Sequence, residues 1–244
     1  MTDDSVFHET HILKSFDRDL EAIQAQIMKM GGLVEEAILK ASQSLEERDE
    51  ELAEKVRKGD KAIDDLETLI NEDTARVIAL RAPTATDLRV ILSVMKIAGN
   101  LERIGDYAKN MAKRTGVLVH MSPIHGSHAA LRRMAREVQM MLKDALDAYI
   151  QRDAELAMDV IQRDEDVDQM YNALFREFLT FMMEDPRNIT ACMHLHFIAK
   201  NTERMGDHVT SIAEQVIYLV KGEMPEAGRP KGDQTSIDPS IGEV

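Results

Sequence analysis

Hydrophobic residues recur at spacings of three and four along most of the chain, which is the periodicity of an amphipathic α-helix. The first such segment covers about residues 8–44. Its apolar stripe is Ile12, Phe16, Leu20, Ile23, Ile27, Met30, Val34, Ala37, Ala41 and Leu45. Gly31 and Gly32 interrupt the stripe. Each glycine costs about 1 kcal/mol relative to alanine, which weakens a helix without ending it. The pattern therefore predicts one long helix.

Two more helices are predicted before residue 116. The second covers about residues 50–80 and begins after Asp49, a residue type that caps helix N-termini. Its expected buried positions are Leu52, Val56, Ile63, Leu66, Ile70, Ala75 and Ile78. Pro83 ends this helix, because a proline disfavours helix in the residue before it. Residues 84–86 supply caps for a third helix over about 86–115, and the glycines and proline of 116–126 indicate a linker.

The same order of residues starts again after the linker. Met30, Val34, Ala41, Asp49, Leu52, Val56, Asp60 and Asp64 recur as Met134, Val138, Ala145, Asp153, Leu156, Val160, Asp164 and Asp168, each displaced by 104 positions. A second set of helices is therefore predicted at about 127–150, 153–184 and 188–221. Residues 222–244 are rich in glycine and proline and lack apolar periodicity, which indicates a disordered tail.

One motif occurs in both halves of the chain. Residues 100–106 and 201–207 share the pattern N-x-E-R-[IM]-G-D, displaced by 101 positions. The duplication predicts an all-α fold, a tandem repeat of two antiparallel, spectrin-like three-helix bundles at residues 8–116 and 127–221. One continuous six-helix bundle is the alternative. Composition does not separate the two, and the long linker favours two units.

Composition narrows the class of protein. Hydrophobic residues make up 44% of the chain, whereas aromatic residues make up only 4%, which favours helices packed through aliphatic side chains. A net charge of −14 makes nucleic acid or an anionic lipid surface a poor partner. The single Cys192, the acidic N-terminus and the absence of an apolar stretch of about 20 residues predict a cytoplasmic protein that does not insert into a membrane.

Four pairs of acidic residues are each spaced by one helical turn. They are Asp60 and Asp64, Glu102 and Asp106, Asp164 and Asp168, and Glu203 and Asp207. A helical projection places the pair in each repeated motif opposite the apolar stripe, on an outer face. Counting from the predicted turns at Pro83 and Pro186 puts the two pairs of each repeat at the same height on neighbouring antiparallel helices. We therefore expect four carboxylates to meet in each half.

Four carboxylates at one level require a counter-charge. Like charges one turn apart repel each other, and the glycine before each motif aspartate suggests that another backbone or a ligand comes close. Oxygen donors suit magnesium, manganese, iron or zinc. The candidate metal ligands are Asp60, Asp64, Glu102, Asp106 and Asn110 in the first half and Asp164, Asp168, Glu203 and Asp207 in the second. Alternatively, Arg103 and Arg204 neutralise an acidic surface.

A metal-dependent phosphohydrolase is the alternative function. Such an enzyme needs an open metal position together with a general base or a nucleophile in a cleft. The sequence offers no such group near either acidic motif, and it holds no phosphate-binding glycine loop and no G-x-S-x-G or H-E-x-x-H pattern. The residues therefore favour a binding protein over an enzyme.

The repeated motif, together with Leu80-Arg81-Ala82-Pro83 and Asp87-Leu88-Arg89 ahead of its first copy, resembles the PhoU family. The resemblance covers about residues 8–221. It implies a cytoplasmic, non-enzymatic regulator, usually a homodimer, that couples the ATPase subunit of the phosphate transporter to a membrane sensor histidine kinase. It also implies negative regulation of the phosphate-starvation response and restraint of phosphate uptake. In that family the acidic pairs carry metal ions, which here implies the nine residues named above.

Overall fold

The computed structural model describes residues 4–81, 83 and 85–225. These residues form six α-helices and one short 3₁₀ turn, with no strand among them. The helices are α1 (Asp4–Glu47), α2 (Glu50–Arg81), α3 (Ala85–Leu118), α4 (Ser127–Gln151), α5 (Ala154–Glu184) and α6 (Ile189–Lys221), and the turn η1 (Pro186–Asn188) precedes α6. The predicted all-α fold is confirmed.

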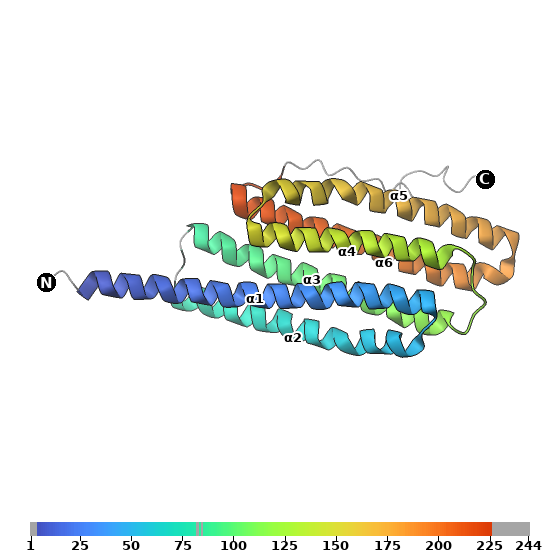
Figure 1. Ribbon diagram of the computed structural model, residues 1–244, viewed down its shortest axis with the longest axis horizontal. Helices are drawn as coiled ribbons and strands as arrows, with labels where there is room; N and C mark the ends of the chain where they lie inside the picture. The colour runs from blue at the N-terminus through green and yellow to red at the C-terminus, as the bar shows by residue number, and fades with distance from the viewer. Residues whose placement is uncertain (1–3, 82, 84, 226–244) are drawn as a thin grey trace.

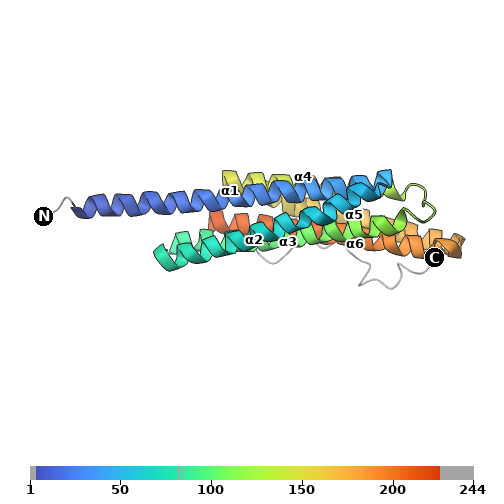
Figure 2. The same cartoon turned by 90° about the horizontal axis from the view of Figure 1, so that it is seen from below.

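The six helices form two groups of three that lie side by side along one long axis (Figure 1). Helices α1, α2 and α3 pack against one another, and so do α4, α5 and α6. The groups meet through two contacts, α3 against α6 and α1 against α4. Helices α1 and α4 lie on one side of the α3–α6 pair (Figure 2). We call the opposite side of α3 and α6 the outer face.

Helices α3 and α6 run antiparallel, and each contains one copy of the repeated motif. Asn100 is hydrogen-bonded to the Nδ1 atom of His208 at 2.8 Å. Further along, Thr202 lies 3.6 Å from the sulfur of Met111. Residue numbers in contact therefore rise along α3 while they fall along α6, as antiparallel packing requires. Ile104 and Met205, equivalent residues of the two motifs, lie near the crossing and are fully buried. A local two-fold axis thus relates the two halves.

The first connection of each half is built in the same way. Arg48 and Arg152, at equivalent positions, both adopt the left-handed conformation, with φ of 55° and 56°. The following aspartate then caps the next helix: Asp49 accepts a hydrogen bond from the backbone N–H of Leu52 at 2.9 Å, and Asp153 does the same at the start of α5. These bonds satisfy N–H groups that a helix cannot pair internally. The predicted cap is confirmed.

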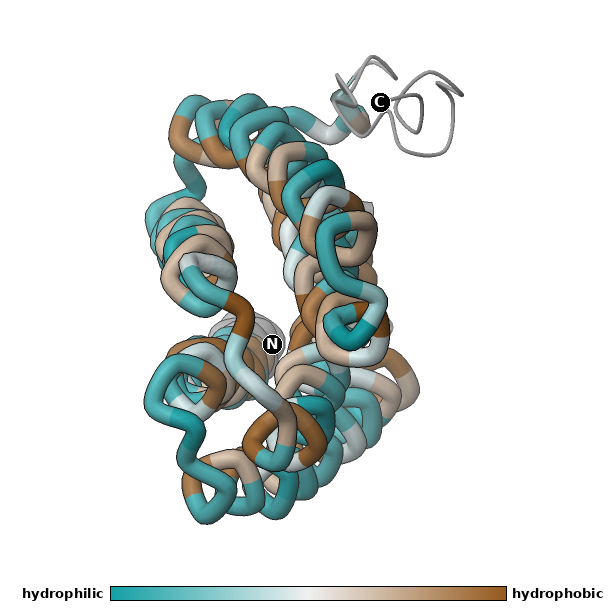
Figure 3. Tube along the Cα trace, turned by 90° about the vertical axis from the view of Figure 1, so that its right-hand side faces the viewer, coloured by the Kyte–Doolittle hydropathy of each residue, from teal (hydrophilic) through white to brown (hydrophobic). Residues whose placement is uncertain are grey.

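Apolar and polar residues are interspersed along every helix (Figure 3), and the buried apolar ones form the core. Most predicted core positions are buried, while Leu20, Ala37 and Leu52 are half-buried and the side chain of Ile12 lies outside the described residues. The prediction is wrong near the end of α2. Ala75 and Ile78 are exposed, whereas Thr74 and Val77 are buried. The buried side of α2 continues from Ile70 to Thr74 and Val77, four and three residues further on. The angular position of a residue around the helix axis, and not its hydrophobicity alone, therefore decides whether its side chain points inward.

Several boundaries differ from the predicted ones. Helix α3 continues through Gly116 to Leu118, so the connection to α4 is shorter than expected. Helix α1 passes through Gly31 without a break, and Gly31 packs against Leu146 of α4. Residue 84, expected to contribute to the cap of α3, and most of the predicted tail (226–244) lie outside the described residues. The division into two separate bundles at 8–116 and 127–221 stays a prediction.

Candidate functional site

The first acidic cluster lies between α2 and α3 and contains a lysine. Asp60 on α2 is buried, with 5% of its surface exposed. The ammonium group of Lys109 on α3 donates to Asp60 at 2.5 Å and to Asp106 at 3.3 Å. These two carboxylates therefore stand at one level, as the count from the turn predicted. The positive charge that balances them comes from the chain itself, from the partly exposed Lys109, which the sequence analysis did not consider.

The other two acids of this cluster carry an electrostatic penalty. Burial is the main cause that raises the pKa of Asp64, and the neighbouring Asp60 raises it further. Burial also raises the pKa of Glu102, followed by repulsion from Asp106 and a weaker contribution from Asp64. These mutual effects place the pairs of α2 and α3 close together. Burial and mutual repulsion therefore penalise the ionised forms of Asp64 and Glu102, and Lys109 offsets part of this penalty at Asp64.

The second cluster, between α5 and α6, is more deeply buried. Asp164, Asp168 and Glu203 are only 3%, 5% and 6% exposed. The ammonium group of Lys200 donates to Glu203 at 3.0 Å and lies 4.8 Å from the centre of the Tyr171 ring. The prediction that the acids of each motif lie on an outer face is therefore wrong for Glu203, because the flank of α6 that carries it packs against α5. Asp60, Asp164 and Asp168 on the preceding helices are buried as well.

The glycine of each motif lets the paired helices approach. A Cβ atom on Gly206 would lie 2.8 Å from a carboxylate oxygen of Asp164, and one on Gly105 would lie 3.0 Å from the end of the Ile63 side chain. The first distance is shorter than real Cβ atoms show, and the second is tighter than most Cβ contacts. The sequence predicted a backbone or a ligand close to these glycines, whereas the groups that approach them are side chains of the neighbouring helix.

The carboxylates are the right donor type for a hard cation, but their side chains are placed around lysines. Among the described residues, no three acidic, histidine or cysteine side chains converge on a point that could hold a metal ion. Asn110 is exposed one turn beyond Asp106. Arg103, the predicted alternative counter-charge, lies 3.6 Å from Glu102. Lys109 could have been found from its i,i+3 spacing to Asp106.

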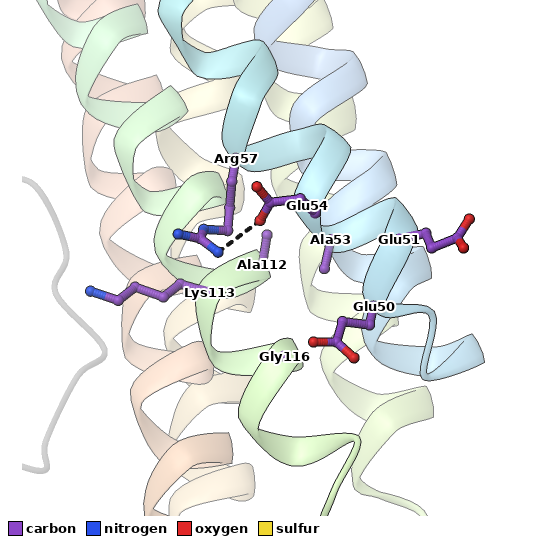
Figure 4. Close-up of a pocket in the computed structure, with 8 residues that line it drawn as sticks. All are labelled: Glu50, Glu51, Ala53, Glu54, Arg57, Ala112, Lys113 and Gly116. Carbon is purple, nitrogen blue, oxygen red and sulfur yellow. Dashed lines mark hydrogen bonds and ion pairs between the residues drawn. The ribbon is translucent and has the colours of Figure 1, made fainter.

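A pocket of about 360 Å³ opens near the start of α2 and the end of α3 (Figure 4). It is lined by Glu50, Glu51, Ala53, Glu54, Arg57, Ala112, Lys113 and Gly116. Arg57 donates to Glu54 at 2.7 Å, and Lys113 points away from Glu50 and Glu51. Because the lining residues provide no nucleophile paired with a base, the pocket does not have the arrangement of a hydrolytic site.

Cys192 and His196 are further candidates for chemistry, and both pack as structural residues. Cys192 is fully buried, and burial raises the pKa of its thiol. His196 lies among the rings of Tyr171, Phe175 and Phe197. Burial, and secondarily Lys200, lowers the pKa of His196, so the imidazole is neutral at pH 7. Neither residue supplies a poised catalytic group.

Paired helical bundles with charged clusters between their helices, and long outer helix surfaces, define a class of helical binding proteins. None of the helices in the described parts of the chain combines the length and apolar character that crossing a bilayer requires. A family model described as the PhoU domain matches twice, over residues 27–115 and 131–216. The chain belongs to the PhoU family.

Relatives match over nearly their whole length. A protein of Rhizobium meliloti (strain 1021), named phosphate-specific transport system accessory protein PhoU homolog, is 44% identical over 95% of this chain and 98% of its own. A homolog with the same name from Zymomonas mobilis is 47% identical over 91% and 93%. The crystal structure of PhoU from Pseudomonas aeruginosa gives a TM-score of 0.82 at 41% identity, covering 85% of this chain and all of that one.

Proposed function

We propose that this chain is an accessory protein of phosphate-specific transport that acts in the cytoplasm. It represses the phosphate-starvation response and modulates phosphate uptake by coupling the ATPase subunit of the phosphate ABC transporter to its sensor histidine kinase. The observation that carries this proposal is full-length similarity to proteins named as accessory to phosphate transport. The homodimer implied by the resemblance stays a prediction.

The geometry supports binding in preference to catalysis. The carboxylates Asp60 and Glu203 are buried against lysines, so they do not face a substrate cleft. The alternative, a metal-dependent phosphohydrolase, requires an open site with a base. Hydrolysis of a generic phosphate monoester by the purified protein, lost in Asp106→Ala and retained in Lys113→Met, would establish the alternative.

The adaptor is tested by affinity capture from cells grown with abundant and with scarce phosphate. We expect the tagged chain to retain the transporter ATPase subunit and the sensor kinase, and we expect cells that lack the chain to express starvation genes in phosphate-rich medium. Re-expression of the wild-type chain should restore repression. Capture of neither protein, with normal repression in the deletion strain, would refute the proposal.

We also propose metal binding at the two acidic clusters, on the chemistry of their oxygen donors. Asp60, Asp64, Glu102 and Asp106, with Asn110, would hold the metal in the first half, and Asp164, Asp168, Glu203 and Asp207 in the second. A bound cation would supply the positive charge that the raised pKa values of Asp64 and Glu102 call for. In the first cluster it must displace the ammonium group of Lys109.

Elemental analysis of the purified protein tests this site. We expect Asp106→Ala and Asp207→Ala each to lose the metal of one half while both variants remain helical by circular dichroism, because both residues lie off the core stripe. Asp65→Ala, an exposed acid on α2, is the matched control. Wild-type protein that carries no metal after purification with magnesium, manganese or iron present would remove the assignment.

A further inference from the structure

Large apolar side chains are exposed at equivalent places in the two halves, at the tips of the α2–α3 and α5–α6 hairpins. Leu88 and Leu92 near the start of α3 are 36% and 43% exposed, and Ile189 and Met193 near the start of α6 are 45% and 40% exposed. Each residue of the second pair lies 101 positions after its counterpart. We call these pairs the first and the second tip. Exposed apolar clusters of this kind mark interaction surfaces.

The two tips lie at opposite ends of one face. The α2–α3 and α5–α6 connections stand at opposite ends of the long axis (Figure 1). Leu92 precedes the crossing residue Ile104 by 12 positions, and Met193 precedes Met205 by the same number. At 1.5 Å per residue the tips are about 40 Å apart. Because the local two-fold axis passes between α3 and α6, it carries the outer face onto itself and one tip onto the other.

Two arginines lie near the centre of this face, beside Asp106 and Asp207 of the same motifs. Arg103 lies 11 residues after Leu92 and Arg204 lies 11 after Met193, three helical turns that return to the same side of the helix. The Arg103 side chain is 62% exposed and its ion pair with Glu102 is long, at 3.6 Å. Arg204 is exposed, and a hydrogen bond to Tyr107 is the main cause that raises its pKa.

We infer that the outer face docks a two-fold symmetric protein dimer. Each subunit of that dimer would bind one tip through an apolar socket and would place acidic residues against Arg103 and Arg204. This inference rests on the proposed adaptor function and adds the docking face, the symmetry of the partner and a ratio of one chain per partner dimer. A face on which a local two-fold axis relates the two tips matches a symmetric dimer, because each subunit of a dimer carries one copy of the same binding site.

The charges on the outer face favour a different protein over a second copy of this chain as the partner. Two copies stacked on this face about the same axis would set Arg103 and Arg204 of one copy against the same arginines of the other. Like charges facing each other at an interface are unfavourable. An acidic partner surface would instead pair with the two exposed arginines.

The test uses the full-length chain with the purified transporter ATPase subunit and with the cytoplasmic part of the sensor kinase. The mass of each complex is measured by light scattering, and affinity is measured for Leu92→Asp, Met193→Asp and the double variant. We expect one chain per partner dimer. Either single substitution should weaken binding about tenfold or more. The double variant should bind more weakly still, because it also loses the gain in affinity that two linked contacts provide.

The matched control is Leu39→Asp on α1. Leu39 is 47% exposed, and the equivalent residue of the second half is Lys143. We expect wild-type affinity and an unchanged melting temperature for this control. A complex with one chain per partner subunit, or a loss confined to one tip, would overturn symmetric docking and leave the adaptor function standing.

Two further outcomes would also overturn the inference. Absence of binding to both proteins would remove the adaptor proposal together with the docking face. Conversion of a homodimer into a monomer by Leu92→Asp and Met193→Asp would show that the outer face is covered by a second copy of this chain.

Discussion

The two acidic clusters are built from the same motif and differ in depth. In the second half, three of the four acids are nearly inaccessible to solvent, whereas in the first half only Asp60 is. The residues beside them explain the difference. Lys200 contacts both Glu203 and the ring of Tyr171. The positions equivalent to Tyr171 and Lys200 in the first half hold Glu67 and Gly99. A repeated motif therefore fixes where the acids lie, while neighbours outside the motif set their burial and charge.

The largest expected effect tests the symmetry on which this comparison rests. Ile104 and Met205 are equivalent and fully buried near the crossing of α3 and α6. Replacing either with alanine leaves a cavity that should cost about 2–5 kcal/mol of unfolding free energy. Chemical denaturation should give similar losses for the two variants. A loss above about 3 kcal/mol for one and below about 1 kcal/mol for the other would show that the crossing is not shared equally.

The lysine of the first cluster gives the next largest effect. Lys109→Met keeps the alkyl chain and removes the charge, which leaves the buried Asp60 without its donor at a cost of about 1–3 kcal/mol. The hydrogen bond to Asp60 is the main cause that raises the pKa of Lys109. Its stabilising contribution is therefore complete below pH 10.5 and is lost only as the pH rises through the higher folded-state pKa.

Thermal melts at pH 7 are the measurement for Lys109→Met, with Lys113→Met as the control. Lys113 is exposed on the next turn of α3, and its replacement should leave the melting temperature unchanged. Added manganese should restore part of the stability lost in Lys109→Met if a cation takes the vacated position. Equal melting temperatures for the two variants would remove the lysine from the account of the first cluster.

The motif glycines should respond differently to alanine. A Cβ on Gly206 would clash with the carboxylate of Asp164, which is buried and has no solvent to move into, so Gly206→Ala should destabilise by about 1 kcal/mol or more. A Cβ on Gly105 would meet the flexible end of Ile63. Gly105→Ala should therefore be neutral or gain up to about 1 kcal/mol from helix propensity. Urea titration measures the difference between the two variants in unfolding free energy. No difference is expected if the second hairpin is as loosely packed as the first.

The smallest effect depends on pH. The folded-state pKa of Glu102 is raised, so this group favours the folded protein below about pH 4.5, and that contribution is lost as the pH rises through the folded-state value. Glu102→Gln should therefore stabilise the protein at pH 7 by a few tenths of a kcal/mol, and the gain should disappear below about pH 4.5. The exposed Glu72→Gln serves as control. A gain that persists at pH 4 would point to a cause other than charge.

Much of the fold and part of the site could be predicted from local pattern. The 3.6-residue period identified the helices, and the 104-residue repeat correctly placed the second capping aspartate, Asp153. Counting from Pro83 placed Asp60 level with Asp106 because antiparallel helices rise equally per residue. The projection of a single helix failed for Glu203, since it locates a side chain relative to the helix axis and contains no information about what packs against the opposite flank.

The sequence by itself determined the duplication, the helical periods and the level at which the acids of each hairpin meet, because these depend only on spacing along a helix of fixed rise. Tertiary structure decided which acids are buried, that Lys109 reaches Asp60, and that α3 and α6 cross at the two motifs with both tips on one face. Those outcomes depend on contacts between residues distant in the chain, whose geometry follows from how whole helices pack and not from the period of any one of them.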